Sequence, residues 1–485
     1  MRRIHVFYWL PAVLVISFSQ FLFAQDDFLP TDYLRKDFYA GRRAALRASM
    51  PDSSVAVIFA YPTRNFSNDV DYLYHPNPDM YYFSGYKEPH SLLLVFKEPR
   101  TDSAGKTYTE LLFVQKRNAQ AEQWTGKRLG AEGAREKLGI DRVYNGEAFK
   151  NYPVDFSGFK KIIVDKLPAD VPNGYDKADL FDLLEQFRQN SGYVTNNPGR
   201  FDNRLYYELT GKLRRIKTPD EMILLRKAVE ISCQAHTEVM KAIHPGMSEL
   251  EIQGLQEYVH KKQGAEGVGY GSIVGSGENG CVLHYMENTK TRIGNSLLLM
   301  DVGAEYHGYT ADVTRTVPAD GKFSPEEKAI YELVYQAQEA AFKTLRDGSK
   351  FADASKAARE TIADGLLKLG IIKEKKEVSK YYPHGLGHHI GLDVHDRGGM
   401  EILLKDMVIT IEPGIYIPSD SNCDKKWWGI AVRIEDDLLI TENGYEILSR
   451  FAPRKAEDIE KMISQKSALD DFKLTPPEPG RKKAF

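Results

Sequence analysis

The sequence predicts a two-domain α/β protein, in which an N-terminal α/β domain is followed by a larger C-terminal domain. The chain has 485 residues, and a typical domain has ~150, so two or three domains are expected. Apolar runs rich in strand-forming residues alternate with charged helical stretches. Residues 190–204 are rich in turn formers and separate the two halves of that pattern.

The composition places the chain among globular proteins. Hydrophobic residues make up 42% and charged residues 27%, as in ordinary folded domains. The net charge is −3, and the basic residues are interleaved with acidic ones. Nucleic acid binding needs a basic face or stripe, so we expect no nucleic acid partner.

The first residues have the order of an export signal. Two arginines precede an apolar stretch that ends at Ala24, and acidic residues follow it. We expect residues 1–24 to be a cleaved signal peptide and the mature protein to be periplasmic or secreted. The alternative is an uncleaved membrane anchor, because Leu22 is large for its position before the cut, but Pro11 weakens a spanning helix. Three cysteines are too few for a disulfide framework.

The first domain is predicted to cover residues 28–200. Four short apolar runs read as strands, namely "SSVAVIFA", "SLLLVF", "ELLFVQ" and "KKIIVD". Charged stretches with apolar residues at helical spacing, such as "ADLFDLLEQFRQ", lie between or after them. This alternation is typical of an α/β domain.

The second domain is predicted to cover residues 205–465. Its first long helix begins at Thr218, where Glu221 completes a capping box, and ends at Pro245. Helices then lead to strands twice in succession, which indicates two structurally similar halves. These segments are residues 248–263, 295–317, 325–345, 352–369, 406–417 and 430–441. Residues 466–485 are Pro-rich and charged, and we expect a disordered tail.

Acidic residues interrupt the apolar strands of the second domain. A hairpin turning about Tyr306 and His307 would place Asp301 and Asp312 directly opposite each other, with Cβ atoms ~5 Å apart. Two carboxylates that close repel, so either one holds a proton or a cation lies between them. A single strand acid is more often an edge or surface residue.

The second half of this domain also carries acidic residues in apolar strands. Glu412 and Glu435 are both flanked by strand formers, and four of the chain's 12 histidines lie in "YYPHGLGHHIGLDVHD", residues 381–396. Four carboxylates and one neutral imidazole would balance two divalent cations. This oxygen-rich set without thiolate favours Mn²⁺, with Zn²⁺ and Co²⁺ as alternatives. Two such ions would share a bridging water and make hydroxide available near neutral pH, which predicts hydrolysis.

Five segments together resemble a known family. "SIVGSGENGCVLHY", "MDVGAEYHGYTADVTRTV", "HGLGHHIGLDVHD", "TIEPGIYI" and "VRIEDDLLIT" are similar, in this order, to the signature segments of the dinuclear metallopeptidases with the pita-bread fold, most closely the aminopeptidase P (Xaa-Pro aminopeptidase) family. "NPDMYYFSGYKEPHSLLLVF" and "AEQWTGKRLG" resemble the N-terminal domain of that family. The resemblance implies an aminopeptidase P-like N-terminal domain and a pita-bread catalytic domain.

The resemblance also implies which residues form the site. The five implied metal ligands are Asp301, Asp312, His388, Glu412 and Glu435. The implied catalytic residues are His284, His384, His395 and Glu412, with Glu412 taking a proton from the attacking water. The implied substrate-binding residues are Tyr270, Trp124 and Arg433, and Arg433 is also expected to orient a ligand carboxylate. The alternative for the two aromatics is ordinary core packing. His389 is expected to be structural, and His75 stands where relatives often have an arginine.

The implied activity is removal of an N-terminal residue from peptides whose second residue is proline. A metal-bridging hydroxide would attack the carbonyl that precedes proline, and the protein would be a homodimer or homotetramer. One alternative is prolidase, an Xaa-Pro dipeptidase with the same metal centre. A second is a non-catalytic binding module that keeps the fold, which the complete ligand set argues against.

Overall fold

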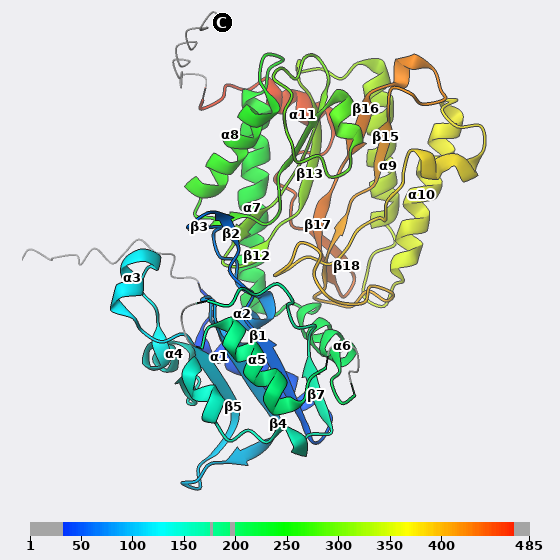
Figure 1. Cartoon of the computed structure of the whole chain (residues 1–485). Helices are drawn as coiled ribbons and strands as arrows, with labels where there is room; N and C mark the ends of the chain where they lie inside the picture. The colour runs from blue at the N-terminus through cyan, green and yellow to red at the C-terminus, as the bar shows by residue number, and fades with distance from the viewer. Residues whose placement is uncertain (1–32, 175–177, 195–198, 470–485) are drawn as a thin grey trace, which may run out of the picture. The chain divides into compact units, whose positions relative to one another are not determined.

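The computed structural model describes residues 33–174, 178–194 and 199–469 (Figure 1). The predicted signal peptide, residues 1–24, and most of the predicted tail lie outside the described residues. Within the described part of the chain, every helix is too short or too polar to cross a membrane.

The first domain is built on a five-stranded mixed sheet (Figure 1). Its strands lie in the order β6 (Val143–Asn145), β5 (Thr107–Val114), β4 (Leu92–Thr101), β1 (Ser54–Phe59) and β7 (Lys161–Val164). The three central strands are antiparallel, and each edge strand runs parallel to its neighbour. All four runs predicted as strands therefore lie in this sheet.

Helices cover both faces of the sheet, which explains why its strands are apolar on both sides. One face packs against α1 (Lys36–Ser49), α2 (Pro78–Ser84) and α4 (Gly130–Leu138), and the other against α5 (Leu180–Ser191). The domain also contains β2 (Asn65–Ser67), β3 (Val70–Asp71), α3 (Ala119–Thr125) and two 3₁₀ helices, η1 (Gly146–Asn151) and η2 (Phe156–Gly158). Helix α6 (Asn203–Arg214) begins within the turn-rich segment 190–204 that separates the two predicted domains.

The four longest helices of the second domain begin within one residue of the positions that the sequence predicts. α7 (Pro219–Ala242) has the complete capping box of Thr218 and Glu221, and α9 (Pro325–Phe342) has an equivalent one. The remaining helices are α8 (Glu249–Lys262), α10 (Phe351–Lys368), α11 (Ala456–Ile463), η3 (Gly277–Cys281), η4 (Lys375–Lys380) and η5 (Lys425–Trp427).

The strands of this domain form small antiparallel sheets. In the first half they are β8 (Gly267–Val268), β9 (Ile273–Ser276), β10 (Leu297–Val302), β11 (Ala304–Tyr306), β12 (Tyr309–Thr310) and β13 (Val313–Pro318). In the second half they are β14 (Val408–Ile411), β15 (Gly414–Ile417), β16 (Ile430–Arg433), β17 (Asp436–Thr441) and β18 (Gly444–Ile447). The Glu435 amide donates to the Thr314 carbonyl at 3.1 Å, so the two halves meet along β13.

The predicted register of the first hairpin is wrong by one residue at its turn. Asp301 pairs with Thr314, not with Asp312. The turn is centred on His307 and Gly308, whose φ values are +50° and +84°. Such a two-residue turn needs positive φ at both positions, and glycine adopts it without strain. The two acids are therefore diagonal neighbours on one face of the hairpin, not directly opposite each other.

Candidate metal centre and active site

Side chains from both halves of the second domain gather around one cavity of about 280 Å³. All five predicted metal ligands line it, as do three predicted histidines and the predicted arginine. These residues are Asp301, Asp312, His388, Glu412, Glu435, His284, His384, His395 and Arg433. Segments more than a hundred residues apart in the chain therefore supply one site.

Strand ends position the carboxylates. Asp301 lies in β10, and Asp312 directly precedes β13. Glu412 follows β14, and Glu435 lies between β16 and β17. The segment with His388 runs close beside β14, where a Cβ on Gly387 would come within 2.0 Å of the Thr410 carbonyl oxygen. Glycine is required there because the two backbones approach so closely that no side chain would fit between them.

Three of the predicted ligands are close enough to hold one cation. Ligand atoms of Asp312, His388 and Glu435 all lie within 4.8 Å of one another. The His388 Nε2 atom lies 3.4 Å from Asp312 Oδ2 and 3.6 Å from Glu412 Oε1.

The environment of Glu435 also fits a cation. The carboxylate is buried, and its Oε2 accepts a hydrogen bond from Thr314 at 2.7 Å. Its Oε1 has no hydrogen-bond partner among the described residues. A buried carboxylate oxygen without a partner is costly, and a divalent ion would satisfy it. The oxygen-rich donor set with one imidazole suits such an ion.

The carboxylates are too crowded to be ionised together without compensation. Tyr270 Oη lies 2.6 Å from Asp301 Oδ1 and 2.6 Å from Asp312 Oδ1, although a hydroxyl donates only one proton. Burial and, as the next largest cause, the charge of Asp312 raise the pKa of Glu435 well above its usual value. Burial likewise raises the pKa of Glu412 to about 7. The pKa of Asp301 is also raised by burial, despite the opposing charge of Arg433.

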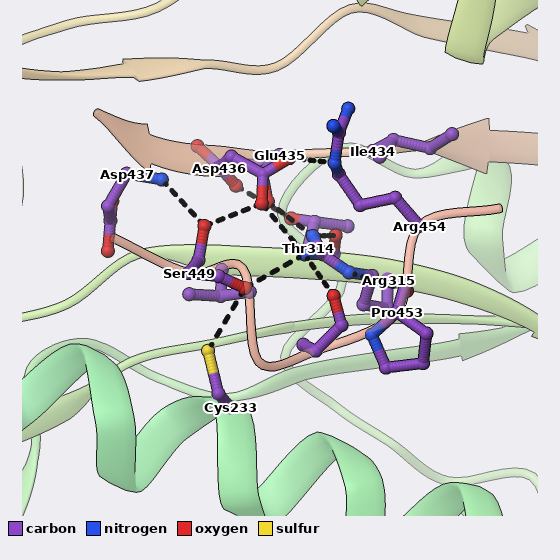
Figure 2. Close-up of polar contacts among 12 residues, drawn as sticks. Cys233, Thr314, Arg315, Ile434, Glu435, Asp436, Asp437, Ser449, Pro453 and Arg454 are labelled. Carbon is purple, nitrogen blue, oxygen red and sulfur yellow. Dashed lines mark hydrogen bonds and ion pairs between the residues drawn. The ribbon is translucent and has the colours of Figure 1, made fainter. Parts of the chain in front are cut away.

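A buried hydrogen-bond network holds the main chain at Glu435 and the neighbouring Asp436 carboxylate in place (Figure 2). Arg315 Nη1 donates to the Glu435 carbonyl at 2.6 Å, and Nη2 donates to Asp436 Oδ1 at 2.7 Å. The same guanidinium donates to the Pro453 carbonyl at 3.0 Å. Sequence reasoning missed this network, although an arginine inside the β-branched run "DVTRTV" was a visible signal.

The Arg433 guanidinium links a carboxylate to a histidine. Nη2 donates to Asp301 Oδ2 at 2.6 Å, and Nη1 donates to Tyr416 Oη at 2.8 Å. His384 Nε2 lies 2.8 Å from that hydroxyl, and its Nδ1 lies 2.8 Å from the Gly385 carbonyl. A carbonyl only accepts, so His384 carries its proton on Nδ1 and accepts from Tyr416 at Nε2. Burial and the charge of Arg433 lower the pKa of His384 to about 4, which keeps it neutral. Sequence reasoning missed Tyr416, which reads as an ordinary strand residue in "GIYI".

The other predicted residues take different places. The His395 ring lies 4.3 Å from the His388 ring, nearly perpendicular to it, and His284 is exposed at the cavity. His389 is buried, and its Nε2 lies 3.3 Å from the Gly399 carbonyl. Trp124 is 85% exposed on α3, and this chain does not bring it to the cavity. That short helix buries none of its residues, so no packing directs the indole ring inward.

Comparison with protein families identifies the class. The family model described as "Metallopeptidase family M24" matches residues 223–442. The family model described as "Aminopeptidase P, N-terminal domain" matches residues 39–160. The chain belongs to metallopeptidase family M24 and is a metallo-aminopeptidase with an aminopeptidase P N-terminal domain. The predicted fold class, an N-terminal α/β domain followed by a pita-bread domain, is confirmed.

Individual relatives agree with this assignment. The chain is 36% identical to an Xaa-Pro aminopeptidase of Escherichia coli over 434 residues, which is 87% of this chain and 96% of the relative. It is 33% identical to an Xaa-Pro aminopeptidase of Haemophilus influenzae, covering 89% of this chain and 98% of that one. A structure of E. coli aminopeptidase P with the inhibitor Pro-Leu matches with a TM-score of 0.78 and 34% identity, over 89% of this chain and 98% of that chain.

Proposed function

We propose that this protein is an Xaa-Pro aminopeptidase, which hydrolyses the bond between an N-terminal residue and a penultimate proline. The observation that carries the proposal is the convergence of all five implied metal ligands on one cavity. The similarity to proteins named Xaa-Pro aminopeptidase over most of the chain supports it.

Membership of family M24 implies divalent metal ions. We propose two ions, with Mn²⁺ preferred and Zn²⁺ or Co²⁺ as alternatives. Their ligands would be Asp301, Asp312, His388, Glu412 and Glu435. When bound, the ions would acidify a water molecule and polarise the scissile carbonyl.

The side chains of the cavity would divide the remaining tasks. Glu412, whose pKa is raised to about 7, is suited to accept a proton from the attacking water and to return it to the departing proline nitrogen. His284 and His395 border the cavity and would donate hydrogen bonds to the substrate carbonyl as negative charge develops on its oxygen. Arg433 fixes the Asp301 carboxylate, near which the free amino group of the substrate would bind.

Two further properties belong to the proposal. We infer export to the periplasm or the exterior after cleavage of residues 1–24, because of the order of charged and apolar residues there. We also infer a homodimer or homotetramer, on the basis of the family resemblance.

Peptide length separates this proposal from its nearest rival. The full-length protein, supplied with Mn²⁺, should cleave Ala-Pro-Ala between its first two residues, and the Asp312→Ala variant should not. Cleavage of Ala-Pro without cleavage of Ala-Pro-Ala would favour an Xaa-Pro dipeptidase. Absence of both metal binding and peptide cleavage would favour a non-catalytic binding module.

A further inference from the structure

The cavity at the metal centre is the first of three that follow one another. The second, of about 220 Å³, shares His395 with the first and extends to His75. The third, of about 530 Å³, shares His75 with the second. Shared lining residues therefore place the three cavities next to one another, from the catalytic site to the N-terminal domain.

The boundary between the second and third cavities is formed by His75, which lines both and contacts Glu305. His75 Nε2 lies 2.8 Å from Glu305 Oε2, and Glu305 lies on β11 of the catalytic domain. Both residues line the second cavity. The contact joins the two domains where the cavities meet, so a peptide that runs from the metal centre to the third cavity would pass the His75–Glu305 pair.

The third cavity, which we call the hairpin cavity, is largely apolar. Its walls come from the start of the β2–β3 hairpin, the segments on either side of it and Pro168. The hairpin side contributes Tyr61, Pro62, Arg64, Asn65, Tyr72, Leu73, Tyr74 and His75. Tyr72 is 58% exposed and Leu73 is 89% exposed. Exposed apolar side chains gathered in one patch are a mark of ligand-binding grooves and interaction sites. A volume of about 530 Å³ lies in the range of ~300–1,000 Å³ that is usual for ligand sites.

The chemistry of an aminopeptidase identifies the occupant. An enzyme that removes one residue needs room for only that residue before the scissile bond. The remainder of the peptide, of any length, must leave the site on the other side, and an extended chain advances ~3.3 Å per residue. Three adjoining cavities offer more room than a single residue requires, so they fit the part of the peptide that follows proline.

We propose that the hairpin cavity binds substrate residues downstream of proline and gives the enzyme a preference for longer peptides with an apolar side chain there. This inference rests on the proposed aminopeptidase function. Tyr72 and Leu73 are specificity-determining residues in this account, and they take no part in the chemistry at the metal centre.

A peptide series tests the proposal on the full-length protein supplied with Mn²⁺. The substrates are Ala-Pro-Ala, an all-alanine heptapeptide with proline second, and five heptapeptides that carry one phenylalanine at positions three to seven. We expect one or two phenylalanine positions to raise kcat/KM about tenfold over the all-alanine heptapeptide, since burial of an aromatic ring supplies that much binding.

Variants locate the effect. Leu73→Asp and Tyr72→Ala should remove most of the phenylalanine advantage while leaving Ala-Pro-Ala turnover unchanged. Leu250→Asp is the matched control, because Leu250 is 59% exposed on α8, away from the three cavities. It should change neither quantity. Circular dichroism of each variant checks the fold.

The outcomes separate the inference from the proposed function. If Ala-Pro-Ala is cleaved but no phenylalanine position is preferred, the hairpin cavity does not bind substrate and the inference is wrong. The same conclusion follows if Leu73→Asp and Leu250→Asp have equal effects on every peptide. If no peptide longer than Ala-Pro is cleaved, the proposed function fails and the inference fails with it.

Discussion

Replacement of Arg315 by methionine should destabilise the protein strongly, because this arginine holds the strand beside Glu435. Arg315 and Asp436 form an ion pair in which both side chains are 0% exposed. The guanidinium also donates to the main-chain carbonyls of Glu435, Ala452 and Pro453. Methionine fills a similar volume but donates nothing, so these acceptors would lose their partner without leaving a large cavity.

The structure sets the expected size of the loss. Removal of one partner of a buried ion pair costs about 3–5 kcal/mol, because the other charge stays buried. Asp436 keeps contacts with Arg454 and Ser449, which favours the lower half of that range for the pair. The orphaned carbonyls add about 1–3 kcal/mol each where no water replaces the donor. The ion pair alone therefore predicts a decrease of about 3–4 kcal/mol in the free energy of unfolding, and carbonyls that stay without a donor make the decrease larger.

Urea denaturation at pH 7, followed by tryptophan fluorescence, measures this change. Arg204→Met is the matched control, since Arg204 pairs with Glu208 and their side chains are 88% and 55% exposed. That variant should lose less than about 0.5 kcal/mol. Equal unfolding midpoints for the two variants would refute the structural role assigned to Arg315.

Three further predictions concern the metal centre. Tyr270→Phe removes the hydroxyl near Asp301 and Asp312. This variant should lower activity about 10- to 100-fold, because the loss of the hydroxyl weakens metal binding. Unchanged metal affinity in equilibrium dialysis would contradict this expectation. Burial alone would lower the pKa of His388, but Asp312 raises it to about 9, and the pKa of Glu412 is about 7. Both groups hold protons at pH 6 that a metal must displace, so Mn²⁺ affinity should rise between pH 6 and 8 with proton release. Calorimetry in buffers of different ionisation enthalpy measures that release, and a pH-independent affinity would count against it. Asp312→Ala should abolish activity while the metal-free protein still folds, because the loss of repulsion with Asp301 and Glu435 offsets the loss of the contact with His388. A variant without a cooperative thermal transition would show that Asp312 is needed for the fold.

Local patterns in the sequence predicted much of the fold. The apolar runs of the first domain and the capping box at Thr218 depend on neighbouring residues only, and both appear in the structure. The four strand acids were also visible, because charge in an apolar run signals a need for compensation. The resemblance to the aminopeptidase P family then added His388 to the predicted metal ligands. Spacing alone could not distinguish His388 from His384 or His395.

Features that depend on distant contacts or on turn geometry were harder to predict. The hairpin register was misplaced because the conformational preference of Gly308 for positive φ was not weighed. The contacts of Arg315 with Asp436 join positions 121 residues apart, and no local pattern pairs them. Tyr416 likewise gains its place between Arg433 and His384 only through the folded sheet.

A metal-dependent centre in this cavity should cleave the bond before a penultimate proline. Titration of Mn²⁺ into the metal-stripped, full-length protein, with bound metal and Ala-Pro-Ala hydrolysis followed together, tests it most directly. The expected result is two bound ions per chain and activity that rises with their binding, with neither binding nor activity restored in Asp312→Ala at the same Mn²⁺ concentration. Full hydrolysis by protein that holds no metal, or metal binding without cleavage of any Xaa-Pro peptide, would contradict it.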